Sequence, residues 1–195
     1  MLAKQLRPAL VATAVLAALT GLGYPALVTG LAQLLFPRQA NGSLVTVDGR
    51  VVGSELIGQG FSRPEYFHPR PSAAGAGYDA TASGGTNKGP TDRKLADTLI
   101  AGSVAEVRAT ESVSGPLPAD MVTRSASGLD PHISPANASL QVARVAAARG
   151  VGADLVRDVL TRYTEGRQFG FFGEPRVNVL MLNIALDSAF GRQGR

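Results

Sequence analysis

Thirty consecutive residues near the N-terminus, residues 8–37, carry no charge, and this run constrains the chain more than any other feature. About 20 apolar residues are enough to cross the hydrocarbon of a bilayer as a helix. No later stretch is as long without a charge, so the sequence predicts a single membrane span. Everything after the span is then expected to form a water-soluble domain at one membrane face.

A proline inside the run indicates how its surplus length is used. One straight helix over the whole run would measure about 45 Å, more than the roughly 30 Å that a bilayer core needs. We expect Pro25 to end or kink the helix near Tyr24, leaving residues 26–36 as an interfacial stretch. The competing interpretation is a cleavable signal peptide, with Val28 and Gly30 as the small residues before the cut.

Basic residues that flank the run predict its orientation. Lys4 and Arg7 lie beside its short N-terminal end, whereas only Arg38 lies close to the far end. Because basic residues favour the cytoplasmic side of a span, we expect the N-terminus in the cytoplasm. The predicted organisation is a cytoplasmic tip and anchor over residues 1–38 and an extracytoplasmic domain over residues 39–195.

The composition of the chain argues against two classes of protein. The net charge is +4, but the basic residues form no long run and few aromatic residues lie among them. Nucleic acid is therefore not expected as a partner. The chain has no cysteine, which excludes a disulfide framework and fits either side of the membrane.

The domain mixes strand and helix signals, which predicts an α+β fold. Asp48 and Gly49 stand between two β-branched runs and predict a tight hairpin over residues 44–52. Caps, prolines and apolar spacing predict one helical turn, three helices and a late strand. In chain order these are residues 92–111 (helix), 118–123 (turn), 135–149 (helix), 152–165 (helix) and 177–180 (strand).

Apolar spacing also predicts which faces of the first and last helices are buried. The helix that follows the cap Thr91 or Asp92 is expected to bury Ala96, Ile100, Val104 and Val107. The helix over residues 152–165, ended by Gly166, is expected to bury Val156, Val159, Leu160 and Tyr163.

Signals for enzymatic chemistry are sparse. The chain has neither a P-loop nor a nucleophile-elbow motif. Its two histidines, His68 and His132, are isolated, so a metal site is not expected. Ser125, Ser127, Asp130 and His132 fall close together, but the members of a catalytic triad usually lie far apart in sequence. Since Ser-Gly and Asp-Pro pairs are ordinary turn formers, we expect a turn that leads into the next helix.

A glycine loop contains Ser83, Gly84 and Gly85. Its backbone N–H groups could meet an anion. However, neither a preceding strand nor a following Lys-Ser pair supports a phosphate site, so a structural turn is the favoured interpretation.

Small residues recur four positions apart inside the span, where Ala14 is followed by Ala18 and Ala17 by Gly21. This spacing lets another helix approach closely. The pattern predicts packing against a membrane partner, although alanine is also common in spans that only anchor.

Four loop motifs carry a family resemblance. They are residues 67–72 (FHPRPS), 78–87 (YDATASGGTN), 125–135 (SASGLDPHISP) and 173–180 (GEPRVNVL). Together with the start of the chain at residues 6–10, they resemble the C subunit of the bacterial Kdp-type potassium-transporting ATPase. The similarity covers essentially the whole chain, with a longer linker at residues 73–77 and Gly152 at a helix start as the departures.

The resemblance implies a place in a complex of the bacterial inner membrane. Its other members would be a channel-like subunit that holds potassium, a P-type ATPase subunit that hydrolyses ATP, and a very small single-span subunit. This chain lacks the Asp-Lys-Thr-Gly phosphorylation motif, and one helix cannot enclose an ion pathway. We therefore expect a non-catalytic accessory subunit without a cofactor, needed for assembly and activity, whose domain sits on the potassium-binding subunit near its outer entrance.

Two alternatives stay open at this point. The family has also been described as raising the pump's affinity for ATP, which would make Ser83, Gly84 and Gly85 a nucleotide contact and would require a cytoplasmic domain. If the resemblance misleads, Ser127 and His132 could belong to a membrane-anchored hydrolase.

Within two polar loops, residues 78–90 and 125–135, a few residues are expected to shape a surface that a partner recognises. Asp and Asn side chains can accept hydrogen bonds from backbone N–H groups two residues on, and so fix an Asx turn. The residues expected at this surface are Tyr78, Asp79, Asn87, Asp130 and His132.

Overall fold

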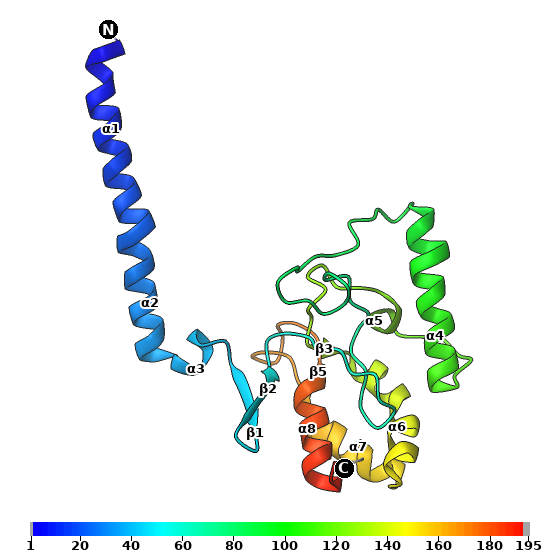
Figure 1. Cartoon of the computed structure of the whole chain (residues 1–195). Helices are drawn as coiled ribbons and strands as arrows, with labels where there is room; N and C mark the ends of the chain where they lie inside the picture. The colour runs from blue at the N-terminus through cyan, green and yellow to red at the C-terminus, as the bar shows by residue number, and fades with distance from the viewer. Residues whose placement is uncertain (1, 193–195) are drawn as a thin grey trace. The chain divides into compact units, whose positions relative to one another are not determined.

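The computed structural model describes residues 2–192 and divides into two compact units, Met1–Val52 and Gly53–Arg195, each described here by itself (Figure 1). The first unit is dominated by one long apolar helix over Lys4–Leu35, which is long enough to cross a membrane. None of its most apolar stretch is buried by other parts of the chain. Its side chains therefore need lipid or other helices as neighbours.

The long helix is built from α1 (Leu2–Ala18), a wide π-helical turn η1 (Leu19–Gly23) and α2 (Tyr24–Leu35). The predicted end of the helix near Tyr24 is therefore wrong, and residues 26–35 continue it. Proline has no N–H and its ring clashes with the carbonyl one α-turn before it. Here the helix widens just before Pro25, and the N–H of Tyr24 bonds to the oxygen of Leu19, five residues back. The wider turn lets the helix pass the proline.

A short helix and a hairpin follow the long helix. α3 (Pro37–Ala40) precedes β1 (Leu44–Val47) and β2 (Arg50–Ser54), which form a two-stranded sheet. Asp48 and Gly49 both have positive φ angles, 51° and 75°, as a tight primed turn requires. The predicted hairpin is confirmed.

The second unit has three core helices and a small sheet. The helices are α6 (Pro135–Arg149), α7 (Ala153–Arg162) and α8 (Val179–Phe190), which pack together below the loops in Figure 1. The strands β3 (His132–Ile133), β5 (Arg176–Asn178) and β4 (Thr164–Glu165) lie in the order β3-β5-β4, all antiparallel. This confirms the predicted α+β class.

The core of this unit joins apolar residues from the three helices, from β3 and β5, and from a loop. Fully buried side chains include Phe67 from a loop, Ile133 from β3, Val142 and Val145 from α6, Val156 from α7, and Leu182 and Leu186 from α8. Burying such side chains is the main force that holds the domain together.

The helix α6 begins and ends where its sequence predicts. Ser134 caps it by accepting a hydrogen bond from the N–H of Asn137, and Pro135 fills the first turn. Gly150 ends it with a φ of 65°, a left-handed conformation that glycine adopts easily.

Two other boundaries differ from the prediction. α7 ends at Arg162, before Gly166, because Thr164 and Glu165 pair as β4 with Val177 and Arg176 of β5. Tyr163 is correspondingly 40% exposed, whereas the other three predicted core residues of this helix are buried.

The late strand is also shorter than predicted, because β5 stops at Asn178 and α8 follows at once. The side chain of Asn178 accepts a hydrogen bond from the N–H of Met181 and so caps α8. Leu180 therefore lies in a helix and not in a strand. An apolar run of this length does not by itself distinguish the two.

The helix after Asp92 exists, but its buried face is different. It consists of a π-helical part η2 (Lys94–Ile100) and α4 (Ala101–Glu111), and the Asp92 carboxylate accepts hydrogen bonds from the N–H groups of Lys94 and Leu95. Ala96 is exposed, and the other three predicted core positions are only half-buried. The buried residue of α4 is the polar Ser103. This helix contacts α6 and the turn before it but contributes no side chain to the main core. A single turn, α5 (Ala119–Val122), follows as predicted.

Candidate functional site

The proline-rich segment at residues 61–71 is held in place by hydrogen bonds from side chains, and not by the backbone hydrogen bonds of a β-sheet. As its prolines predict, it forms no helix or strand. The carbonyl oxygens of five consecutive residues, 64–68, all accept side-chain hydrogen bonds. The donors are Arg144 Nη1 to Pro64 and Tyr66 (2.6 and 2.9 Å), Arg149 Nε to Glu65 (2.7 Å), Asn183 Nδ2 to Phe67 (3.0 Å) and Gln141 Nε2 to His68 (3.0 Å).

Two buried side-chain amides each bond to both the N–H and the carbonyl of one residue in this segment, as the backbone of a neighbouring β-strand would. Asn183 of α8 accepts from the N–H of Phe67 at 2.8 Å while it donates to the carbonyl of the same residue. Gln141 of α6 does the same for His68, with an N–H bond of 2.7 Å. Since unpaired buried backbone groups are costly, these amides fix the path of the chain between α6 and α8.

Two arginines tie the same segment to the helices around it. Arg149, whose side chain is fully buried, pairs with Asp187 of α8 at 2.8 Å and stacks over the ring of Tyr66. Arg144 pairs with Glu111 at 2.9 Å and so joins α4 to α6. Burial raises the pKa of Glu111, while the nearby guanidinium of Arg144 opposes that rise.

The two polar loops predicted to form a partner surface, residues 78–90 and 125–135, interlock. The contacts also include residues just before the first loop, and we name residues 70–87 and 125–132 together the loop pair. Ser72 Oγ donates to the carbonyl of Gly128 at 2.6 Å, and the N–H of Gly84 and Oγ of Ser83 both donate to the carbonyl of Ser127. A Cβ on Gly128 would lie 2.6 Å from the backbone nitrogen of Ala74, so only glycine fits this crossing.

Aspartates fix the two tight turns of the loop pair as predicted. Asp79 accepts from the N–H and the hydroxyl of Thr81, at 2.9 and 2.7 Å. Asp130 accepts from the N–H of His132 at 3.0 Å and from Arg70 Nη1 at 2.8 Å. Burial would raise the pKa of Asp130, but hydrogen bonds from His132 and Arg70 outweigh it and lower that pKa to about 2.

The other expected surface residues take distinct positions. Tyr78 is half-buried and its hydroxyl donates to the carbonyl of Arg70 at 2.6 Å. Burial, with a smaller contribution from Glu106, raises the pKa of Tyr78 to about 12. Asn87 is exposed and has a φ of 52°, a left-handed conformation that asparagine tolerates better than most residues.

The side chains of Ser127 and His132 make their contacts in different turns of the loop. Ser127 Oγ accepts from the N–H of Leu129 at 3.1 Å and lies 3.4 Å from Ser125 Oγ. His132 Nδ1 lies 3.6 Å from Asp130. These contacts are those of a turn that leads into α6, as predicted.

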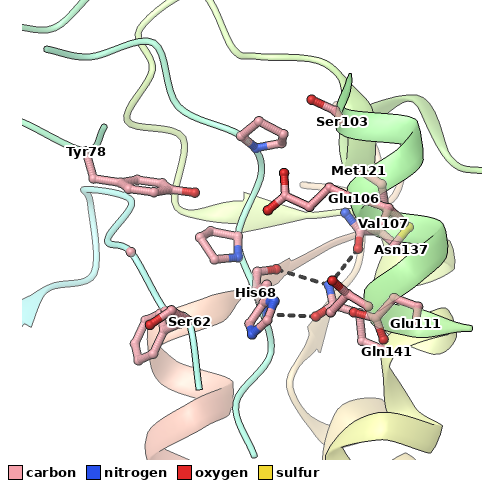
Figure 2. A pocket seen from close by; sticks show the side chains of 15 residues that line it. Ser62, His68, Tyr78, Ser103, Glu106, Val107, Glu111, Met121, Asn137 and Gln141 are labelled. Carbon is pink, nitrogen blue, oxygen red and sulfur yellow. Dashed lines mark hydrogen bonds between the residues drawn. The ribbon is translucent and has the colours of Figure 1, made fainter. Parts of the chain in front are cut away.

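A cavity of about 530 Å³ lies between α4 and the proline-rich segment (Figure 2). Tyr78 lies across it from Glu106 of α4, while His68 and Gln141 form its floor. Burial, and then the charge of Arg144, lower the pKa of His68. A second cavity, of about 540 Å³, is lined by the side chains of Arg70, Asp120, Asp130, His132, Glu174 and Arg176, among other residues.

Sequence reasoning missed the buried amides, which were detectable in part. Asn137 and Gln141 lie one helical turn apart on α6, and Gln141 Nε2 donates to Asn137 Oδ1 at 2.8 Å. Asn137 Nδ2 in turn donates to Asp120 at 3.0 Å. Both amides occur among apolar residues of a well-capped helix, and polar residues at such positions indicate a buried network.

The small residues predicted to face a membrane partner belong to the first unit. The four small residues of the span, Ala14, Ala17, Ala18 and Gly21, are exposed on the long helix. Within residues 2–192, no three His, Cys, Asp or Glu side chains gather in a way that could hold a metal ion.

A helix long and apolar enough to span a bilayer, followed by an α+β unit with interlocked polar loops, is the arrangement of a membrane-associated protein. The family model for the K⁺-transporting ATPase c chain matches residues 6–188. The chain therefore belongs to this family.

Similar proteins extend over almost the full length of the chain. A potassium-transporting ATPase KdpC subunit of Gemmatimonas aurantiaca is 63% identical over 186 residues, which cover 95% of this chain and 93% of that protein. The protein of the same name from Myxococcus xanthus is 62% identical over 174 residues, covering 89% and 82%. That from Koribacter versatilis is 54% identical over 184 residues, covering 94% of both.

Proposed function

We propose that this chain is a non-catalytic accessory subunit of an ATP-driven potassium import complex in the inner membrane. Its relatives are named as subunits of a potassium-transporting ATPase, so its partners are the other subunits of such a complex. These comprise a potassium-binding, channel-like subunit, a P-type ATPase subunit and a small single-span subunit. The chain needs no cofactor of its own for this role.

The observation that carries this proposal is the use of polar side chains in the loop pair. Asp79, Ser127 and Asp130 each accept hydrogen bonds from backbone N–H groups of their own turns. A nucleophile needs its base within hydrogen-bond reach, whereas Ser127 and His132 serve separate turns. Because these side chains bond to the backbone of their own turns, the loop surface is rigid and preformed. A preformed surface lowers the entropy cost of binding a partner.

The proposed orientation places this surface outside the cytoplasm, on the potassium-binding subunit near its outer entrance. Lys4 and Arg7 at the short end support a cytoplasmic N-terminus. The family match begins at residue 6 and so includes the apolar helix, which supports a retained anchor over a cleaved signal peptide.

The alternative, a nucleotide contact at Ser83, Gly84 and Gly85, is less well supported. The N–H of Gly84 already donates to the carbonyl of Ser127 at 2.9 Å. A Cβ on Gly85 would lie 3.0 Å from the carbonyl of Ala126. The loop therefore packs closely on its neighbour, and one of the N–H groups that a phosphate would need is already paired.

Two variants of one loop test the proposal in the assembled complex. Asp130→Ala removes the acceptor for His132 and Arg70, which is expected to destabilise the loop by about 2 kcal/mol and to reduce co-purification with the potassium-binding subunit. Ser127→Ala is the matched control and is expected to leave assembly and potassium-dependent ATPase activity nearly unchanged. Loss of turnover in Ser127→Ala with assembly intact would overturn the non-catalytic role.

A further inference from the structure

The strands β4 and β5 are joined by a hairpin whose tip is strongly aromatic. We name residues 168–172 the aromatic tip. Its three phenylalanines are exposed in the structure: Phe169 by 88%, Phe171 by 64% and Phe172 by 58%. Together they present on the order of 400 Å² of aromatic surface, which is comparable to the largest apolar patch on a typical soluble monomer. An apolar patch of this size on one short loop is expected to contact another surface.

The backbone of the tip is closed on itself. The N–H of Gln168 bonds to the carbonyl of Phe172 and the N–H of Phe172 bonds to the carbonyl of Gln168, both at 2.9 Å. The N–H groups of Gly170 and Phe171 bond to the carbonyls of Arg167 and Gln168. Pairing backbone groups internally lowers the cost of moving a segment out of water, and four of the five N–H groups of the tip are paired in this way.

The conformation of the tip displays its rings and does not bury them. Phe169 has a φ of 53°, a left-handed conformation that is strained for a bulky residue. Gly170 follows with a φ of 82°, and the rings of Phe171 and Phe172 lie 4.2 Å apart between their centres. Strain of this kind persists where the surrounding structure holds it and is concentrated at functional sites.

Charges stand at the base of the hairpin, not at its tip. Arg167 pairs with Glu174 at 2.8 Å, and Arg176 pairs with Glu165 at 2.9 Å. These pairs are locally neutral, so they neither repel a lipid surface nor require an anionic one. Guanidinium groups beside apolar rings also suit the boundary between headgroups and acyl chains.

The anchor keeps a bilayer within reach of the tip at all times. The second unit starts at Gly53, eighteen residues after the end of α2 at Leu35, so even a fully extended connection would measure about 60 Å. Tethering at such a distance gives the bilayer a high effective concentration. The rings carry no hydroxyl or indole N–H, so the tip offers an apolar surface whose side chains make no hydrogen bonds through their rings.

We propose that the aromatic tip inserts into the interfacial region of the bilayer and forms a second, peripheral membrane contact of this chain. The proposal requires the anchor alone and does not depend on the partner subunits. Its failure would therefore leave the proposed accessory role intact, and failure of that role would leave this contact intact.

The chain contains no tryptophan, so a single introduced one reports its own surroundings. Phe171→Trp is placed in the full-length chain and reconstituted in phosphatidylcholine vesicles, with and without bromine on the acyl chains near the headgroup. Leu155→Trp, at a position on α7 that is 52% exposed, is the matched control. Insertion predicts blue-shifted emission at position 171 and quenching by brominated lipid at least about twofold stronger than at position 155.

A second variant separates insertion from general proximity to lipid. Adding Phe169→Ser and Phe172→Ser to Phe171→Trp is expected to lower the quenching by brominated lipid to the level of the control. Equal quenching at positions 155 and 171 would overturn the assignment to the tip. Emission typical of water, with quenching by aqueous iodide only, would also overturn the proposal and would point to a protein partner for the tip.

Discussion

Replacing Asn183 by leucine tests how the motif at residues 67–72 is held. Asn183 is 1% exposed, and its amide satisfies both the N–H and the carbonyl of Phe67, which is itself fully buried. Leucine fills a similar space but can make neither bond. Each backbone group left unpaired in the core costs about 1–3 kcal/mol, so the expected loss is about 4 kcal/mol. That is a large share of the roughly 5–15 kcal/mol by which a typical domain is stable.

Urea unfolding of the full chain in detergent micelles measures this loss. Three of the four tyrosines, Tyr66, Tyr78 and Tyr163, lie in the second unit, so tyrosine fluorescence mainly reports its unfolding. With a slope of about 2 kcal/mol per molar urea, the midpoint should fall by about 2 M. Ser188→Ala on the exposed face of the same helix is the control and should change stability by no more than about 0.5 kcal/mol. A shift below about 0.5 M for Asn183→Leu would refute the reasoning.

Two further predictions concern Asp130 and the span. The folded-state pKa of Asp130 is about 2 against an ordinary 3.8. The contribution of its carboxylate to folding stability is therefore complete above about pH 4 and is lost as the pH falls toward 2. Between these pH values the free energy of unfolding of Asp130→Asn should fall by about 2 kcal/mol less than that of the wild type. An equal loss in both proteins would refute the assigned pKa. In the span, replacing Ala17 and Gly21 together by leucine should weaken co-purification of the complex without affecting membrane insertion, whereas Ala12→Leu on the opposite face should not. Undiminished assembly in the double variant would mean that the small-residue face contacts lipid.

Sequence reasoning succeeded where the determining signals are local. The helix α6 is specified by Ser134, Pro135 and Gly150, which act within one turn of its ends. The hairpin turn needs only Asp48 and Gly49, whose residue types tolerate positive φ. In both cases the physical cause lies within a few residues, so the pattern predicts the structure directly.

It failed where the outcome depends on partners distant in the chain or on a small geometric adjustment. Nothing near Phe67 indicates that it bonds to Asn183, which is 116 residues away. The strand expected over residues 177–180 stops at Asn178, because the side chain of Asn178 caps α8, which follows at once. At Pro25 the helix tolerates the proline by widening over one turn, a response that propensity arguments do not include.

For the loop pair, the sequence predicted the turns but not their contact. The Asx turns at Asp79 and Asp130 follow from residue type. That the loops interlock through Ser72 and Gly128, 56 residues apart, required the folded structure. The resemblance identified the family, whereas the structure showed which contacts hold these motifs together.

The proposed accessory role requires the domain to lie outside the cytoplasm, and the topology of the chain tests this requirement most directly. A reporter that is active only in the cytoplasm can be fused after Arg195, with the same reporter fused before Lys4 as the control. The account predicts a silent C-terminal fusion and an active N-terminal one, since the basic residues at the short end favour the cytoplasm. A bright cytoplasmic signal from the C-terminal fusion would contradict the account and would restore a direct nucleotide contact as the leading alternative.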